Sequence, residues 1–119
     1  MSNHYTVLGS YTIDGFDVIV DKTWDDTRIA DCFDDSCYDI ADMERRVDRG
    51  ELDWFLLRAR VMLMGHELGS SYLGGCLYED ARECLEDGIA EDVVAEAMKQ
   101  ARREAKILQV ALQNVVDAA

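Results

Sequence analysis

The stretch YTVLGSYTIDGFDVIVDKTW, residues 5–24, decides the first part of the fold. β-Branched and aromatic residues flank Asp14-Gly15, a dipeptide that tolerates the positive φ angles of a two-residue turn. After this turn, apolar and mostly polar residues alternate, which is typical of a strand with one buried face and one wet face. The sequence therefore predicts a β-hairpin here.

A second hairpin is predicted further along the chain. LDWFLLRARVMLM, residues 52–64, alternates in the same way, and ELGSSYLGGCLY, residues 67–78, supplies the returning strand. Gly65-His66 is the expected turn between them. Three glycines of the returning strand mark a bulge, a bend or a close approach of another backbone: Gly69, Gly74 and Gly75.

The segment between the two hairpins has a helical period. From about Thr27 to Arg49, apolar residues recur at spacings of three, four and seven, and Gly50 is a stop signal just past the last turn. Asp34-Asp35-Ser36 interrupts the pattern, as capping residues or as a break. The sequence leaves open whether this segment forms one helix or two.

A long helix is predicted from about Ala90 to Asp117. At 1.5 Å per residue it would span about 42 Å, whereas four strands side by side cover only about 15–20 Å. Part of it should therefore overhang the sheet, and its apolar seam could cover the sheet or pack against a second copy. Both uses stay open for the seam residues, which recur with a heptad-like period: Val94, Met98, Ala101, Ala105, Leu108, Leu112 and Val115.

These elements predict an α+β fold of the ββαββα type. Two β-hairpins form an antiparallel sheet, with a helical segment between them and a long C-terminal helix. The 119 residues contain no proline and no linker-like stretch, and 49% of them are apolar, so we expect a single domain spanning residues 1–119. The order of the strands and the number of subunits are left open.

The net charge of −13 is the most unusual property of the chain. Residues 14–44 carry 11 acidic and two basic side chains. A surface of this kind cannot bind nucleic acid directly, because phosphate contacts need Lys and Arg. It could instead be a solvated face that maintains solubility, or a surface for a positively charged partner.

The stretch TWDDTRIADCFDDSCYD, residues 23–39, concentrates this charge. Trp24 and Tyr38 could anchor a partner, since aromatic residues dominate interface energies, although Trp24 could equally cap the core at the end of the hairpin. If the acidic residues form one face, its density of charge could imitate that of a DNA duplex. The predicted partner-binding residues are Asp17, Asp21, Trp24, Asp25, Asp26, Asp31, Asp34, Asp35, Tyr38 and Asp39.

Metal, cofactor and enzyme signals are weak. The acidic stretch lacks the alternating ligands and central glycine of a calcium loop, and the four cysteines lack the close spacing of structural zinc sites. No phosphate-binding loop or nucleophile elbow is present. Cys76, which follows two glycines, could be a nucleophile or a core residue. We therefore expect no metal, no cofactor and no enzymatic activity.

Location is also suggested by the sequence. The N-terminus has no basic-then-apolar signal, and no apolar run approaches the length of about 18 residues that a membrane span needs. These features indicate a cytoplasmic protein without a membrane partner. Its cysteines should then be reduced.

Three stretches carry a resemblance to a group of known proteins. They are YTIDGFDVIVDKTWDD (residues 11–26), RGELDWFLLRARVM (residues 49–62) and GHELGSSYLGGCLYED (residues 65–80). Over about residues 10–105 the chain resembles small acidic accessory proteins of phages and mobile elements. The resemblance supplies no catalytic motif, but it implies an anti-defence role of the anti-CRISPR or antirestriction type in a bacterial host.

Two functions remain open at this point. The leading hypothesis is a non-enzymatic, anti-CRISPR-like inhibitor that binds a host nucleic-acid-binding complex through an acidic, DNA-mimicking surface. The alternative is a structural or assembly protein that self-associates through its C-terminal helix, with charge serving only solubility. The identity of the target is not specified by the sequence.

Overall fold

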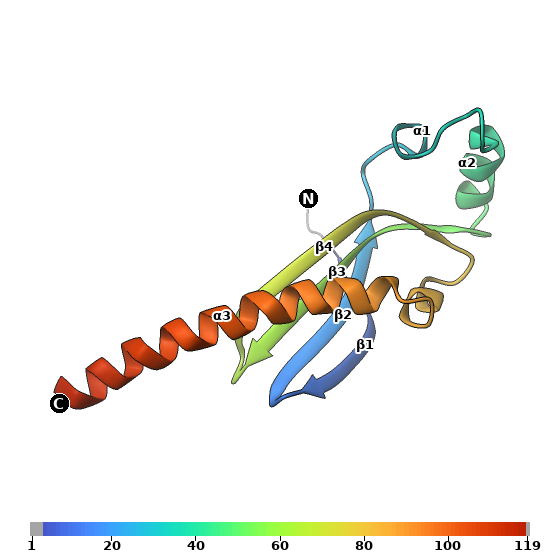
Figure 1. Ribbon diagram of the computed structural model, residues 1–119. Coiled ribbons are helices and arrows are strands. Elements are labelled where there is room, and N and C mark those ends of the chain that lie inside the picture. Colours follow the sequence, from blue (N-terminus) through green and yellow to red (C-terminus); the bar gives the residue numbers. More distant parts are fainter. Residues whose placement is uncertain (1–3, 119) are drawn as a thin grey trace.

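The computed structural model describes residues 4–118, which form a four-stranded antiparallel sheet with a long helix across one face (Figure 1). The strands lie side by side in chain order, β1-β2-β3-β4. The predicted α+β fold of the ββαββα type is confirmed. Its elements are β1 (Thr6–Ile13), β2 (Phe16–Trp24), α1 (Ile29–Cys32), α2 (Ile40–Asp48), β3 (Asp53–Leu63), β4 (His66–Tyr78), the short 3-10 helix η1 (Ala81–Leu85) and α3 (Ile89–Ala118).

Both hairpins close through two-residue turns with positive φ angles. Asp14 and Gly15 have φ angles of 51° and 86°, as the sequence predicts. The second turn consists of Met64 and Gly65, with φ angles of 51° and 81°. The prediction of Gly65-His66 was wrong by one residue, because His66 already pairs with Leu63 in the sheet.

The core lies between the sheet and the first half of α3. The buried side chains of β2 and β3 on this face include Val18, Val20, Leu57 and Val61. Gly69 in β4 lets the helix approach closely, since a Cβ atom at this position would lie 2.2 Å from the Ala97 carbonyl oxygen. The close approach expected from the glycine pattern is therefore confirmed at Gly69.

The apolar seam of α3 has two environments. Val94, Met98 and Ala101 are buried against the sheet, so the prediction that they serve self-association is wrong. Ala105 is half-buried, and Leu108, Leu112 and Val115 are exposed. Figure 1 shows the reason, because the second half of α3 projects beyond the sheet. The seam covers the sheet and also continues past it.

The segment between the hairpins forms two short helices, which settles the question that the sequence left open. α1 ends at Cys32, and α2 begins after Asp39, whose side chain accepts a hydrogen bond from the Asp42 amide at 3.1 Å. The intervening Asp34 accepts a hydrogen bond from the Ser36 amide at 2.9 Å, as in an Asx turn. Capping and turn chemistry therefore separate the two helices.

Candidate partner-binding surface

Two of the predicted partner-binding aspartates are buried. Asp21 is only 1% exposed and accepts two hydrogen bonds from Arg58, at 2.8 Å from Nε and 2.6 Å from Nη2. Arg60 adds an ion pair at 3.7 Å. Asp21 and Arg58 are direct cross-strand neighbours on the sheet face opposite α3, and the Tyr5 ring stacks on Arg58 at 3.4 Å. Asp21 therefore stabilises the sheet, and its assignment to a partner surface was wrong.

Asp25 is also structural. It is 7% exposed, and its two carboxylate oxygens accept hydrogen bonds from the amides of Thr27 at 2.8 Å and Gly75 at 2.7 Å. Gly75 lies in the predicted β4 bulge and has a φ angle of 71°. Burial raises the pKa of the Asp25 carboxyl, but the hydrogen bonds more than offset this, so its pKa lies below the ordinary value. The assignment of Asp25 to an exposed acidic face was therefore also wrong.

The other aspartates of the stretch are exposed. We call residues 26–39 the acidic segment; its only basic side chain is Arg28. Hydrogen bonds from Ser36 hold the pKa of Asp34 below its ordinary value, so this side chain stays ionised at neutral pH. Within residues 4–118, no ion pair is formed by its five carboxylates, Asp26, Asp31, Asp34, Asp35 and Asp39.

Asp17 is exposed but lies far from this segment. It follows the β1–β2 turn, seven positions before the end of β2, which corresponds to about 23 Å of strand. The ten predicted residues therefore do not form one continuous face.

A groove of about 280 Å³ lies beside the acidic segment, between the loop after β2 and the helix α2. Trp54 contributes to its lining and is fixed by a hydrogen bond of 2.9 Å from its Nε1 to the Thr27 carbonyl oxygen. We call it the acidic groove, because four carboxylates line it and Arg28 is the only basic residue in its lining. Its lining consists of Trp24, Asp25, Asp26, Thr27, Arg28, Ile29, Glu44, Val47, Asp48 and Trp54. Because the Asp25 carboxylate is engaged by backbone amides, the carboxylates available to a ligand are those of Asp26, Glu44 and Asp48.

These three carboxylates have no ion-pair partner among the described residues. Glu44 and Asp48 were missed by the sequence predictions. Their spacing of four residues on α2, which places both on one side of the helix, is the signal that could have found them. The groove combines aromatic and aliphatic surface with unpaired negative charge.

Both predicted aromatic anchors are accessible. Trp24 is 60% exposed and lines the groove. Tyr38 is 49% exposed, and its ring packs edge-on against Phe33 with a centroid separation of 5.0 Å. The Phe33 ring in turn lies beside the Trp54 ring, with a centroid separation of 6.1 Å. This aromatic chain connects the acidic segment to the wall of the acidic groove.

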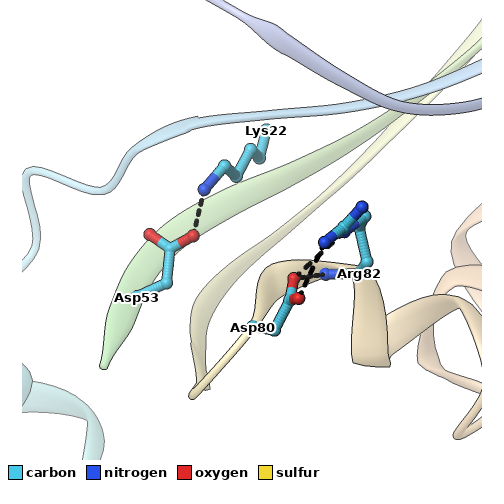
Figure 2. Close-up of polar contacts among 4 residues, drawn as sticks. All are labelled: Lys22, Asp53, Asp80 and Arg82. Atoms are coloured by element: carbon cyan, nitrogen blue, oxygen red, sulfur yellow. Dashed lines mark hydrogen bonds and ion pairs between the residues drawn. The ribbon is translucent and has the colours of Figure 1, made fainter. Parts of the chain in front are cut away.

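A second groove, of about 670 Å³, shares Trp24, Val47 and Trp54 with the first but has a different charge arrangement. Figure 2 shows four of its charged side chains. Lys22 is paired with Asp53, and Asp80 is paired with Arg82 at 3.1 Å. Its charges are therefore largely neutralised within the chain, unlike those of the acidic groove.

The cysteines offer no nucleophile at the predicted position. Cys76 is buried, and burial raises the pKa of its thiol to about 11. At neutral pH it is therefore protonated and out of contact with solvent, as expected of a core residue. Within residues 4–118, no group of three or more His, Cys, Asp or Glu side chains is placed to hold a metal ion.

None of the helices in the described part of the chain combines the length and apolar character needed to cross a bilayer. Comparisons with protein families, with curated protein sequences and with solved structures gave no match. The resemblance to phage and mobile-element proteins therefore stays a prediction.

Proposed function

We propose that this chain is a binding protein that receives cationic side chains of a positively charged, nucleic-acid-binding protein in the acidic groove. The observation that carries the proposal is the unpaired state of Asp26, Glu44 and Asp48 beside an aromatic wall. Carboxylates left without internal partners keep their capacity to form charge-assisted hydrogen bonds with a ligand.

The lining of the groove suits a long basic side chain. The methylene stem of an Arg or Lys can lie against Trp24 and Val47, while its charged end reaches the carboxylates. Exposed Trp rings also attract cations, most favourably the guanidinium group, which can bind a carboxylate through two hydrogen bonds. We therefore expect an arginine of the partner to occupy the groove.

The acidic segment would extend this contact electrostatically. Its five exposed carboxylates attract a positively charged surface before contact and so accelerate association. A channel that normally binds the phosphates of DNA is such a surface. By occupying it, the protein would compete with nucleic acid.

The anti-defence role implied by the sequence resemblance is a specific form of this proposal. In that form the protein is a phage or mobile-element product that acts in the cytoplasm of the host cell. Its partner is a CRISPR effector or a restriction enzyme, and binding blocks access to DNA.

Charge reversal within the groove tests the proposal. Asp26→Lys, Glu44→Lys and Asp48→Lys are combined in one variant, and Glu67→Lys, Glu86→Lys and Glu96→Lys in a control with the same change of net charge. The control residues are exposed acids on β4, after η1 and on α3 that form no ion pair with any other described residue. Each protein is immobilised and exposed to bacterial lysate, and retained proteins are identified by mass spectrometry.

We expect the wild-type chain and the control to retain a DNA-binding protein that is released by high salt and by duplex DNA. The groove variant should lose it. Equal retention by the two variants would refute the groove as the binding site. The anti-defence form is then tested by measuring whether the purified chain reduces DNA binding by the captured protein.

A further inference from the structure

The second half of α3 presents an apolar stripe whose large side chains are exposed in the described part of the chain. We call residues 105–118 the overhang; at 1.5 Å per residue it is about 21 Å long. The stripe continues the helix side that is buried up to Ala101, with Leu108, Ala111, Leu112 and Val115 near its centre. The large exposed aliphatic side chains of the overhang are Ile107, Leu108, Val110, Leu112, Val115 and Val116.

A helical segment of this length has little stability of its own. The overhang continues an already nucleated helix, so each added residue brings little net stabilisation, and most helical stability in proteins comes from packing of an apolar face. The first half of α3 obtains that packing from the sheet, whereas the overhang does not. A helix partner for the overhang would supply the missing contact.

The exposed area is large enough for a stable interface. The chain has an accessible surface of 7890 Å² and a mass of 13.5 kDa, whereas a compact monomer of this mass exposes about 6,500 Å². The excess of about 1,400 Å² belongs to the chain as a whole, in which the overhang projects from the compact body, and it is larger than the roughly 800 Å² that each partner buries in a standard interface. The radius of gyration, 18.0 Å, likewise exceeds the value of about 13.5 Å for a compact domain of this length.

The distribution of charge favours a second copy of the chain as the partner, because the overhang is a long apolar surface that carries no net charge. The overhang, residues 105–118, carries one basic and one acidic side chain, a net charge of zero, whereas residues 1–104 carry 11 basic and 24 acidic side chains, a net charge of −13. Two copies would repel each other through most surfaces but can approach through their overhangs. A basic partner of the acidic groove would find no attraction there. We propose that the overhang forms an antiparallel helix pair with the overhang of a second copy.

Antiparallel pairing over the full overhang defines a register. Ala105 lies level with Ala118 of the second copy and Leu108 with Val115, and the two-fold axis passes between Ala111 and Leu112. The sheets then lie at opposite ends of the pair. Figure 1 places α1 and α2 at the end of the molecule away from the overhang, so both acidic grooves stay free. A parallel pair would instead bring two negatively charged bodies side by side.

Sedimentation equilibrium of two matched variants tests the pairing. Leu112→Glu places a charge in the stripe, whereas Val110→Glu places the same charge on the opposite side of the helix. The two positions are matched in exposure, since Leu112 is 62% exposed and Val110 is 64% exposed. We expect the wild-type chain and Val110→Glu to have twice the chain mass of 13.5 kDa and Leu112→Glu to have the mass of one chain. Circular dichroism and thermal unfolding verify that both variants are folded.

Three results would overturn the proposal. They are a monomeric wild-type chain at concentrations of hundreds of micromolar, a dimer that survives Leu112→Glu, and growth into open-ended oligomers. The last result would indicate head-to-tail contact between the overhang and the acidic part of another copy.

Disulfide formation tests the orientation. Cys32→Ser and Cys37→Ser first remove the two exposed cysteines. In that background we expect a mixture of Leu108→Cys and Val115→Cys chains to cross-link with each other under mild oxidation. Self-cross-linking of Val115→Cys as efficient as the mixed reaction would instead show a parallel pair and refute the antiparallel arrangement.

Discussion

Asp21 and Asp25, at the end of β2 and just after it, lie in the same acid-rich part of the chain as Asp26 and Asp35 of the acidic segment. The two regions differ in the partners that the fold gives to their carboxylates. Both Asp21 and Asp25 are buried. Asp21 accepts hydrogen bonds from the Arg58 side chain, and Asp25 accepts hydrogen bonds from two backbone amides. Asp26 and Asp35 are exposed and form no ion pair within residues 4–118. Charge along the chain therefore does not distinguish aspartates that stabilise the fold from those available to a partner.

The largest effect should come from removing the Asp21 carboxylate. In Asp21→Ala, Arg58 and Arg60 lose the carboxylate that pairs with both of them on the sheet. We expect a loss of about 3 kcal/mol in the free energy of unfolding, because breaking a buried ion pair leaves charge uncompensated. Chemical denaturation monitored by circular dichroism measures this change.

Asp17→Ala is the matched control, since Asp17 lies four positions earlier on the same side of β2 and is exposed. Its effect should stay within about 0.5 kcal/mol. Equal effects of the two substitutions would contradict the distinction between buried and exposed aspartates.

A smaller effect is expected at Asp25. Asp25→Ala leaves the Thr27 and Gly75 amides without their acceptor, which should lower the free energy of unfolding by about 2 kcal/mol. Its neighbour Asp26 has no such partners, so Asp26→Ala should change stability by less than about 0.5 kcal/mol. Chemical denaturation at neutral pH compares the two variants.

The pH dependence of the same pair gives an independent check. The pKa of Asp25 is lowered in the folded state, so its contribution to stability is complete above the unfolded value of about 3.9. It is lost as pH falls through the lowered folded pKa, because the folded state must then be protonated against its hydrogen bonds. The difference in the free energy of unfolding between wild type and Asp25→Ala should therefore become smaller at acidic pH. A difference independent of pH would show that packing, not the ionised carboxylate, is responsible.

The sequence predicts most of the fold because its signals are local. Alternation and the Asp14-Gly15 turn define the first hairpin, and the length of α3 compared with the width of the sheet predicts the overhang. The predicted position of the second turn was wrong by one residue, because Gly65 can occupy either position of a two-residue turn and the observed turn is Met64–Gly65.

The candidate site depends on contacts between distant residues, which the sequence alone does not specify. Asp21 is buried because the register of β2 and β3 places it opposite Arg58, 37 positions away. Asp25 is buried because a bulge 50 positions later presents the Gly75 amide. The acidic groove likewise requires α2 to pack beside the loop that follows β2.

The smallest effect, and the one with opposite sign, is expected in the acidic segment. Asp31→Asn combined with Asp35→Asn removes two exposed charges that make no ion pair in the part of the chain that the structure describes. Relief of like-charge repulsion should raise the free energy of unfolding by about 0.2–0.5 kcal/mol at low salt. At about 1 M salt the gain should vanish, because the screening length falls to about 3 Å.

The sign of this change matters more than its size. Asp80→Asn is the control, because Asp80 is exposed but paired with Arg82, and its neutralisation should not raise stability. If neutralising Asp31 and Asp35 also lowered stability, their carboxylates would be held by interactions within the chain. They would then not be free for a basic partner, and the proposed role of the acidic segment would lose its physical basis. A small gain that salt abolishes would instead mean that the fold tolerates a local electrostatic cost, which a positively charged partner would relieve on binding.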